Sequence, residues 1–113
     1  SGGMQKRVGI ARAIALNPTF LFCDEPNSGL DPETAIVIDH LISSLTKELG
    51  ITTIMNTHDL NSIMEIGDNI GFLYKGEIIW QGDRHSILSA ECPQLREFLC
   101  SKTLARNIID KSR

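Results

Sequence analysis

The sequence predicts an α/β fold in which two parallel strands are flanked by helices and followed by an antiparallel hairpin and C-terminal helices. Three observations lead to this prediction. Short apolar runs at residues 19–23 and 51–56 are separated by one long segment with helical spacing of its apolar residues. A strand, a helix and a second strand form a βαβ unit, which makes the two strands parallel. Two further strand-like runs joined by a glycine turn predict the hairpin.

The length, net charge and cysteine content restrict the class of protein. With 113 residues the chain has the size of at most one modest domain, and no apolar run reaches the roughly 18 residues that a membrane span needs. The net charge of -3 argues against broad nucleic-acid binding, so no nucleic-acid partner is expected. Three cysteines without a CxxC pair favour a reducing compartment, which predicts a cytoplasmic protein.

The first helix is expected from Met4 to Leu16, where the residues are rich in Ala, Ile and Leu. It should end there because Asn17 precedes Pro18, and a residue before proline resists the helical conformation. The apolar run at residues 19–23 then predicts a buried strand, and the turn-rich stretch after it predicts a loop.

A long second helix is expected between Asp31 and Gly50. Asp31 is a good N-cap, Pro32 suits the first helical position, and Gly50 supplies the C-terminal stop. The apolar positions keep the spacing of one helical face: Ile38, Leu41, Ile42, Leu45 and Leu49. The strand at residues 51–56 follows directly.

The second half predicts a short helix from Asn61 to Ile66, and then a hairpin with a tight turn at Lys75 and Gly76. This hairpin is expected to form an antiparallel edge of the parallel sheet. Two final helices are expected over residues 84–90 and 93–109. The second of these is amphipathic through Leu95, Phe98, Leu99, Leu104 and Ile108.

Residues capable of chemistry follow both predicted parallel strands. Asp24 and Glu25 end the first strand, and His58 comes directly after the second. Ligands of parallel α/β sheets gather at the carboxyl ends of strands, and an acidic pair there is what magnesium nucleotide chemistry uses. The structural alternatives stay open, because Asp24 can simply start a turn, Glu25 can be a solvated loop charge and His58 can be a capping or core residue.

The opening stretch of the chain offers two readings as well. Gly2 and Gly3 allow backbone N–H groups to approach an anion closely, and Ser1 adds a hydroxyl donor at the positive end of a helix. The alternative is that Ser1 is a helix N-cap followed by two glycines needed for packing. In isolation these residues favour the second reading.

Four stretches in this order, "SGGMQ…ARA", "FLFCDEP", "SGLDP" and "NTHD", resemble the second half of the ATPase domain of ATP-binding cassette (ABC) proteins. The resemblance covers about residues 1–82 and implies part of a P-loop NTPase fold, with residues 83–113 as a C-terminal helical extension. The chain differs from the residues that are frequent in the family at three positions, Met4, Asn27 and Asn56. Many members carry threonine at the position of Asn27.

The resemblance implies a role for each site residue. Glu25 would be the general base toward the attacking water, His58 would hydrogen-bond the γ-phosphate of ATP, and Asp24 would support Mg²⁺, usually through water. Asp31 would link the two active sites of a dimer. The signature motif would contact the γ-phosphate of ATP held by the partner subunit through Ser1, Gly2 and Gly3.

The cofactors and partners implied are ATP, Mg²⁺, a second ATPase subunit in a homodimer and an integral membrane permease. "SGGMQKRVGIARAIALNP" with "CDEPNSGLDP" most resembles the ATPases of mammalian-cell-entry (MCE) or Mla-type phospholipid transport systems. That likeness adds an MCE-type lipid-binding protein as a partner and a lipid as cargo. It implies a cytoplasmic location, peripheral on the inner face of the cell membrane.

No GxxxxGK[ST] motif occurs in these residues, so the loop that cradles the phosphates is expected before Ser1. On that expectation the chain is the C-terminal half of an ATPase and is inactive by itself. Two other hypotheses remain: a non-transport ABC ATPase of DNA repair or translation, and an inactive interaction module that resembles a cassette.

Overall fold

The computed structural model describes residues 2–111, and it describes the side chains of residues 2–103. These residues form two compact units, the first up to Ile66 and the second from Gly67 onward. The division differs from the predicted one between residues 1–82 and 83–113, which concerns functional regions and stays a prediction. Within the described part of the chain, no helix combines the length and the apolar character needed to cross a membrane.

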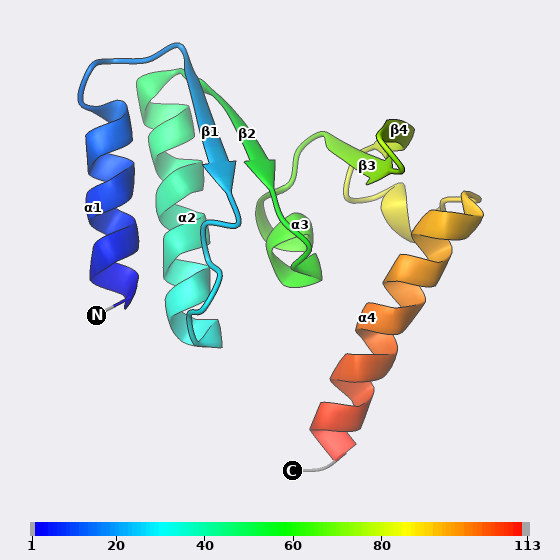
Figure 1. Cartoon of the computed structure of the whole chain (residues 1–113). Helices are drawn as coiled ribbons and strands as arrows, with labels where there is room; N and C mark the ends of the chain where they lie inside the picture. Colours follow the sequence, from blue (N-terminus) through cyan, green and yellow to red (C-terminus); the bar gives the residue numbers. More distant parts are fainter. Residues whose placement is uncertain (1, 112–113) are drawn as a thin grey trace. The chain divides into compact units, whose positions relative to one another are not determined.

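The first unit alternates helices and strands in the order that the sequence predicts (Figure 1). Its elements are α1 (Gly2–Ile14), β1 (Phe20–Asp24), α2 (Pro32–Leu49), β2 (Thr52–Asn56) and α3 (Leu60–Ile66). The strands β1 and β2 are parallel and in register from Phe20 opposite Thr52 to Asp24 opposite Asn56. The βαβ unit is therefore confirmed, and the carboxyl ends of both strands lie at the same edge as the N-terminal ends of α1 and α2.

The first helix begins and ends two residues earlier than the sequence predicts, at Gly2 and Ile14 instead of Met4 and Leu16. Its end is set by Asn17, whose backbone adopts the left-handed conformation at φ 53°. The backbone N–H of Asn17 donates to the carbonyl of Ile14 at 3.1 Å. Asparagine tolerates this conformation better than most residues, so the chain turns here and enters β1.

Both ends of α2 are capped as predicted. The Asp31 side chain accepts a hydrogen bond from the backbone N–H of Thr34, and Pro32 occupies the first turn. Gly50 closes the helix in the left-handed conformation, with φ 62° and ψ 30°. Its N–H donates back to the last turn of the helix, which satisfies carbonyl groups that would otherwise lack a partner.

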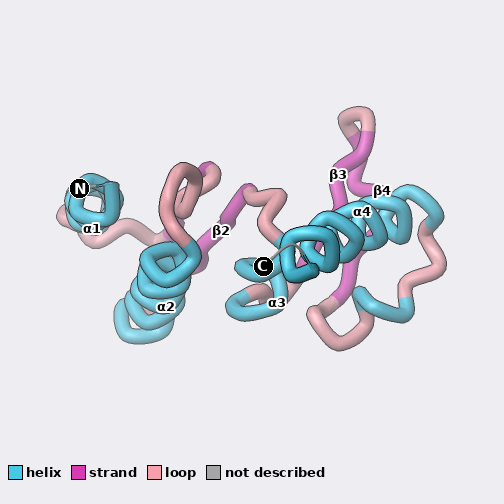
Figure 2. The backbone as a smooth tube through the Cα atoms, turned by 90° about the horizontal axis from the view of Figure 1, so that it is seen from below, coloured by secondary structure: helices cyan, strands magenta, loops and turns pink. Residues whose placement is uncertain are grey.

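The core of the first unit lies between the helices and one face of the β1–β2 sheet. Ile10, Ile38 and Ile42 form its centre, and Cys23 and Met55 of the strands pack against them. Helix α2 contacts both α1 and α3, and Figure 2 shows α1 and α2 side by side. The expected face of α2 is confirmed except at Leu49, which is 47% exposed.

The opposite face of the same sheet carries apolar side chains that remain exposed. Phe20 is 54% exposed, Phe22 72% and Ile54 47%, and Phe22 lies opposite Ile54 in the strand register. Parallel strands are usually buried on both faces, and their sequences are apolar at consecutive positions for that reason. One face of this sheet thus has the apolar composition of a covered surface.

The second unit contains the predicted hairpin and C-terminal helix. Its elements are β3 (Ile70–Tyr74), β4 (Glu77–Gly82), the 3₁₀ helix η1 (Ile87–Ser89) and α4 (Pro93–Lys111). Lys75 and Gly76 both have positive φ, at 48° and 83°, as a type I′ turn requires. Among the described residues the hairpin forms a two-stranded sheet of its own, so its place at the edge of a larger sheet stays a prediction.

Residues 84–90 do not form the helix that the sequence predicts, and only Ile87–Ser89 are helical. The reason lies in Asp83, whose side chain accepts hydrogen bonds from the backbone N–H groups of His85 and Ser86 at 2.9 and 2.7 Å. Ser86 Oγ in turn accepts from the Asp83 N–H at 3.1 Å. These bonds hold the segment in a turn and lower the pKa of Asp83.

The core of the second unit is small. Ile87 and Leu95 are each 1% exposed, and the rings of Phe72 and Phe98 pack with their centroids 5.7 Å apart. Leu95 and Phe98 lie on the predicted inner face of α4. The further positions predicted for that face, Leu104 and Ile108, lie outside the described side chains.

Candidate functional site at the carboxyl edge of the parallel strands

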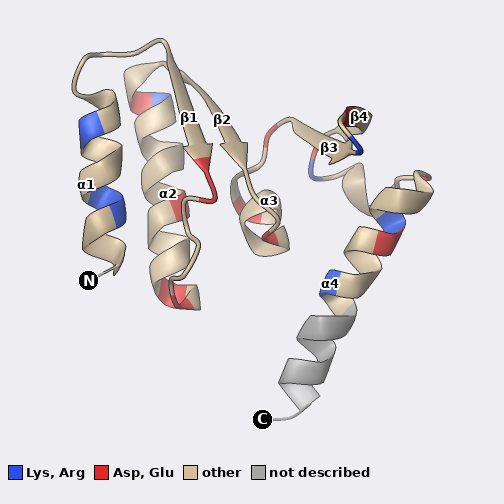
Figure 3. Cartoon of the chain, viewed as in Figure 1, with Lys and Arg blue, Asp and Glu red and all other residues tan. Residues whose placement is uncertain are grey.

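The predicted site residues of the two strands come together in the first unit. Asp24 ends β1 and Glu25 follows it, while His58 lies two residues beyond the end of β2 at Asn56. Because the strands are parallel, both segments leave the sheet at one edge. Figure 3 shows acidic residues at this edge, at the end of β1 and the start of α2.

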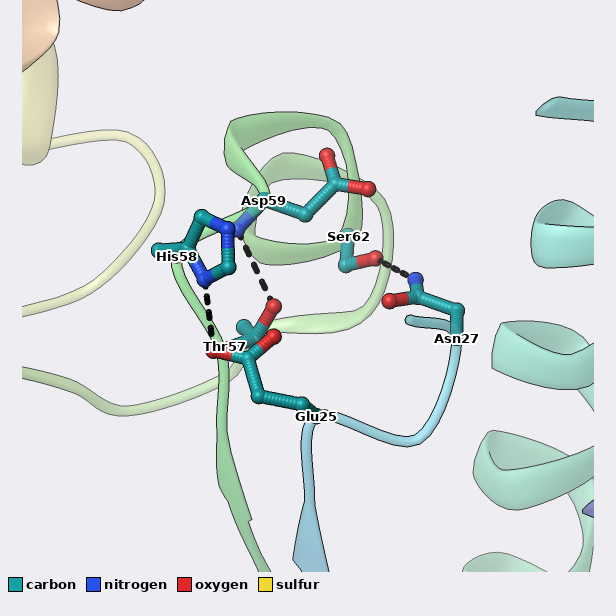
Figure 4. A network of polar contacts seen from close by, with 6 residues as sticks. All are labelled: Glu25, Asn27, Thr57, His58, Asp59 and Ser62. Atoms are coloured by element: carbon teal, nitrogen blue, oxygen red, sulfur yellow. Dashed lines mark hydrogen bonds and ion pairs between the residues drawn. The ribbon is translucent and has the colours of Figure 1, made fainter. Parts of the chain in front are cut away.

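Glu25 and His58 are in direct contact (Figure 4). The distance between Glu25 Oε1 and His58 Nδ1 is 2.6 Å. The His58 side chain is 69% exposed and that of Glu25 is 33% exposed, so the pair lies at the surface, open to a ligand. The contact joins one carboxylate oxygen of Glu25 to one ring nitrogen of His58 and leaves Oε2 and Nε2 outside it.

The backbone of Glu25 is held in a conformation that few residues other than glycine adopt. Its φ is 47°. Its N–H donates to the carbonyl of Asn56 at 2.8 Å, which continues the β1–β2 ladder by one bond, and its own carbonyl accepts from the N–H of Ser28 at 3.1 Å. Such a conformation costs on the order of 1 kcal/mol and persists where neighbouring contacts hold it. The fold thus fixes the direction in which the Glu25 side chain leaves the sheet.

The segment that carries His58 is tied to the start of α3. The N–H of Asp59 donates to Thr57 Oγ1 at 3.0 Å, and Asp59 Oδ1 accepts from the N–H of Asn61 at 2.9 Å. These bonds occupy backbone groups at the beginning of a short helix, where they would otherwise lack partners. The position of His58 therefore depends on the position of α3.

Asp24 is exposed at the end of β1, opposite Asn56 in the register. A carboxylate in this position can hold Mg²⁺ through a water molecule, as Mg²⁺ commonly retains several waters in proteins. Among the side chains of residues 2–103, no three His, Cys, Asp or Glu groups form a cluster that could hold a metal. Of the predicted metal-binding groups, the single carboxylate of Asp24 is thus the one that the end of β1 offers to a magnesium ion.

Asp31 is engaged as the N-cap of α2. Its two carboxylate oxygens accept from Thr34, one from the hydroxyl at 2.6 Å and one from the backbone N–H at 3.2 Å. The hydroxyl and then the backbone group lower the pKa of Asp31, which is fully exposed. The capping role is confirmed, whereas its predicted role in linking two active sites stays a proposal.

Gly2 and Gly3 lie in the first turn of α1, beside the residues that start α2. A Cβ atom on Gly3 would lie 2.8 Å from Cγ2 of Thr34, and one on Gly2 would lie 3.0 Å from Cδ2 of Leu30. Thr34 cannot rotate away cheaply because its hydroxyl is bonded to Asp31. Gly3 therefore has a packing role, as the structural alternative anticipates. Ser1 lies outside the described residues.

A buried polar cluster near the Glu25–His58 pair is not among the residues predicted from the sequence. It consists of Asn27, Asp39 and Ser62, which are 6%, 3% and 0% exposed. One signal was available, because Asp39 lies between Ile38 and Ile42 on the inner side of α2 and interrupts its apolar pattern. A buried carboxylate normally requires partners, and Asn27 and Ser62 supply them.

The sequence of this chain is similar to those of ATP-binding proteins of ABC transporters. Residues 1–28 match the family model described as ABC transporter. A probable ribonucleotide transport ATP-binding protein of Mycobacterium tuberculosis is 38% identical over 99 residues, which are 88% of this chain and 28% of that protein. A methionine import ATP-binding protein of Shouchella clausii is 47% identical over 89 residues, which are 79% of this chain and 26% of that protein. The chain thus spans about a quarter of the length of these relatives.

Solved structures share the fold. A nucleotide-free ATP-binding cassette from an ABC transporter superposes with a TM-score of 0.76 at 30% identity, over 88% of this chain and 40% of that one. The dimeric post-hydrolysis state of an ATP-binding cassette bound to ADP and Pi superposes with a TM-score of 0.65 at 39% identity, over 74% of this chain and 36% of that one. The predicted α/β fold of a partial ABC ATPase is confirmed.

Proposed function

This chain has the sequence and the fold of part of an ABC transporter ATP-binding cassette, and from that premise we propose that it belongs to an ATP-hydrolysing subunit that drives transport. The observation that carries the proposal is the contact between Glu25 at the end of β1 and His58 beyond the end of β2. It joins a carboxylate that can accept a proton to a ring that can donate one, at the edge where such sheets bind ligands.

In this proposal Glu25 is the general base. Its contact with His58 uses Oε1, so the second carboxylate oxygen is left to orient a water molecule and accept its proton. His58 donates a hydrogen bond to the γ-phosphate as charge develops there. Nδ1 contacts Glu25, so Nε2 is the ring nitrogen left to face the phosphate in this proposal. Asp24 would hold Mg²⁺, and the ion would supply positive charge against the phosphates of ATP.

We propose further that two copies of the subunit act together around two nucleotides. The signature residues Ser1, Gly2 and Gly3 of one copy then face the γ-phosphate held by the other, and Asp31 links the two sites. One of the related cassettes described above is dimeric and is bound to ADP and Pi, which supports this arrangement for a relative. Gly2 and Gly3 lie in the first turn of α1, and the N-terminal end of a helix is a favourable place for an anion.

The exposed apolar face of the β1–β2 sheet supports the proposal that this segment works within a larger domain. Phe22 alone leaves 72% of its surface uncovered on that face. A layer of further protein there, together with a phosphate-binding loop elsewhere in the polypeptide, would complete the ATPase. The complete subunit would bind an integral membrane permease from the cytoplasmic side of the cell membrane.

The identity of the transported molecule is a separate part of the proposal. The relatives reported above are named for ribonucleotide transport and for methionine import, and those names do not support the lipid cargo that the MCE/Mla-type resemblance implies. A lipid cargo with an MCE-type partner stays a prediction. Reconstitution of the complete transporter in vesicles tests it, because fluorescent phospholipid and labelled methionine can be offered in parallel and only the true cargo will move with ATP.

Glu25→Gln tests the proposed ATPase in the complete subunit assembled with its permease. The substitution keeps the size of the side chain and its ability to meet His58 but removes the base, so we expect turnover to fall by about a hundredfold or more while ATP binding persists. Glu48→Gln is the matched control because Glu48 is an exposed carboxylate in the last turn of α2. Normal turnover in Glu25→Gln would refute the assignment, and no ATP hydrolysis by the wild type would refute the function.

A further inference from the structure

Three buried side chains near the Glu25–His58 pair form a closed hydrogen-bonded triangle. Asn27 Nδ2 donates to Asp39 Oδ1 at 3.1 Å and to Ser62 Oγ at 2.5 Å. Ser62 Oγ donates to Asp39 Oδ2 at 2.7 Å. We name these three residues the Asn27–Asp39–Ser62 triangle. Every donor and acceptor that its three bonds need comes from its own members.

Each member of the triangle comes from a different segment of the first unit. Asn27 lies in the loop between β1 and α2, two residues after Glu25, and Ser62 lies in α3, four residues after His58. Asp39 lies in α2, which is anchored in the core through Ile38 and Ile42. The triangle therefore ties the two segments that carry Glu25 and His58 to one rigid helix. Figure 4 shows the bond between the two segments, from Asn27 to Ser62.

Short-range bonds carry this restraint from the triangle to the pair. On one side, the N–H of Ser28 donates to the carbonyl of Glu25 and the N–H of Leu30 donates to the carbonyl of Asn27, so the loop has little freedom. On the other side, the N–H of Ile63 donates to the carbonyl of Asp59 at 3.2 Å, which connects the residue after His58 to the turn that contains Ser62. A shift of Asn27 or Ser62 is thus transmitted to the pair.

We propose that Asn27, Asp39 and Ser62 are positioning residues that hold Glu25 and His58 within hydrogen-bond distance of each other. Hydrogen bonds among buried groups allow few alternative arrangements, because another arrangement leaves a polar group without a partner. Burial also raises the pKa of Asp39, and the hydrogen bonds from Ser62 and Asn27 oppose that shift only in part. A carboxyl group is thus kept in the interior at a cost that apolar packing would avoid.

This inference rests on the proposed function for its kinetic test but not for its structural one. In crystal structures of Ser62→Ala and Asn27→Ala, we expect the separation of Glu25 Oε1 and His58 Nδ1 to exceed hydrogen-bond distance. Ser44→Ala is the matched control, because Ser44 is an exposed serine of α2 and its loss should leave the separation unchanged. An unchanged 2.6 Å contact in both triangle variants would overturn the proposal whether or not the protein hydrolyses ATP.

The kinetic test uses the complete subunit. Ser62→Ala and Asn27→Ala should lower kcat by about ten- to a hundredfold, as a small misplacement of reacting groups does, with KM for ATP changed by no more than about twofold. Asn27→Thr keeps a hydroxyl donor for Asp39 and should retain more of kcat than Asn27→Ala. It also provides the measurement if the alanine variants fail to fold.

Combining substitutions separates positioning from general stability. If the triangle acts only through Glu25 and His58, single-turnover rates of the variant carrying both Glu25→Gln and His58→Ala should not fall further when Ser62→Ala is added. Losses that multiply in that combined variant, or a kcat of wild-type size in folded single variants, would overturn the proposal. If instead wild-type protein has no ATPase activity, the proposed function fails while the crystallographic result still decides the inference.

Discussion

Nδ1 of His58 lies 2.6 Å from Oε1 of Glu25, although 33 positions separate the two residues in the sequence. The βαβ unit brings the two residues together, because β1 and β2 are parallel neighbours and the segments that follow them leave the sheet at the same edge. The left-handed backbone of Glu25 and its bond to the carbonyl of Asn56 then turn the carboxylate toward the segment after β2. The pair is therefore a product of the fold and of one unusual backbone conformation.

Replacing His58 by alanine should reduce ATP turnover in the complete subunit by about a hundredfold or more, because a donor aimed at developing phosphate charge is lost. ATP binding at equilibrium should change little. His40→Ala is the control, since His40 is another exposed histidine paired with a glutamate, Glu65, at 2.8 Å. Surface pairs of that kind contribute little, so equal losses in both variants would contradict a specific role for His58.

The free energy of unfolding should depend on pH through the protonation of Asp39. Burial raises the pKa of this carboxyl above its ordinary value of 3.8 in the folded chain, and the nearby Asp59 acts in the same direction while His40 and the two hydrogen bonds oppose it. Between the unfolded and folded pKa values the folded state therefore holds more protons. Stability falls as pH rises through that interval and is constant above it.

Asp39→Asn should remove this dependence. Urea unfolding of both proteins at a series of pH values from 3.8 upward gives the difference in their free energies of unfolding. The contributions of Asp31 and Asp83, whose pKa values are lowered, have the opposite slope but cancel in that difference. A wild type that gains stability over the variant as pH rises would show that the sign is wrong.

The free energy of unfolding should fall strongly when Ile38 is shortened, because this core residue of the first unit is 0% exposed. Ile38→Ala removes buried methyl groups and leaves a cavity, which costs about 2–5 kcal/mol of the free energy of unfolding. Ile36→Ala is the matched control on the same helix, because Ile36 is 51% exposed and should cost less than about 1 kcal/mol. Chemical denaturation measures both, and similar costs would contradict the assignment of the inner face of α2.

Two glycine substitutions should change stability in opposite directions. Gly50→Ala places a side chain at φ 62° at the end of α2, and the left-handed conformation costs about 1–2 kcal/mol for a residue with Cβ. Gly9→Ala in the middle of α1 meets no atom within 4 Å and should stabilise the helix by about 0.5–1 kcal/mol. The shifts in unfolding midpoint test both, and a stabilising Gly50→Ala would contradict the capping role of Gly50.

Much of the fold was predictable because its local signals agree with its tertiary structure. Asp31 and Gly50 mark the ends of α2 by capping chemistry that acts within a few residues. Lys75 and Gly76 mark the hairpin turn in the same way. The prediction of a helix at residues 84–90 was wrong, because helical spacing takes no account of Asp83. The Asp83 side chain accepts a hydrogen bond from the backbone N–H of Ser86 and holds the segment in a turn.

The sequence by itself determined the order of strands and helices, the parallel pairing of β1 with β2 and the residues at their carboxyl ends, since these follow from local periodicity, capping and the geometry of a βαβ crossover. The tertiary structure alone decided that Glu25 meets His58, that Gly3 is needed against Thr34 and that Asp39 is buried between Asn27 and Ser62. Each of these contacts joins residues far apart in the chain. Their distances depend on how the core seats α2 against the strands, which no short stretch of sequence encodes.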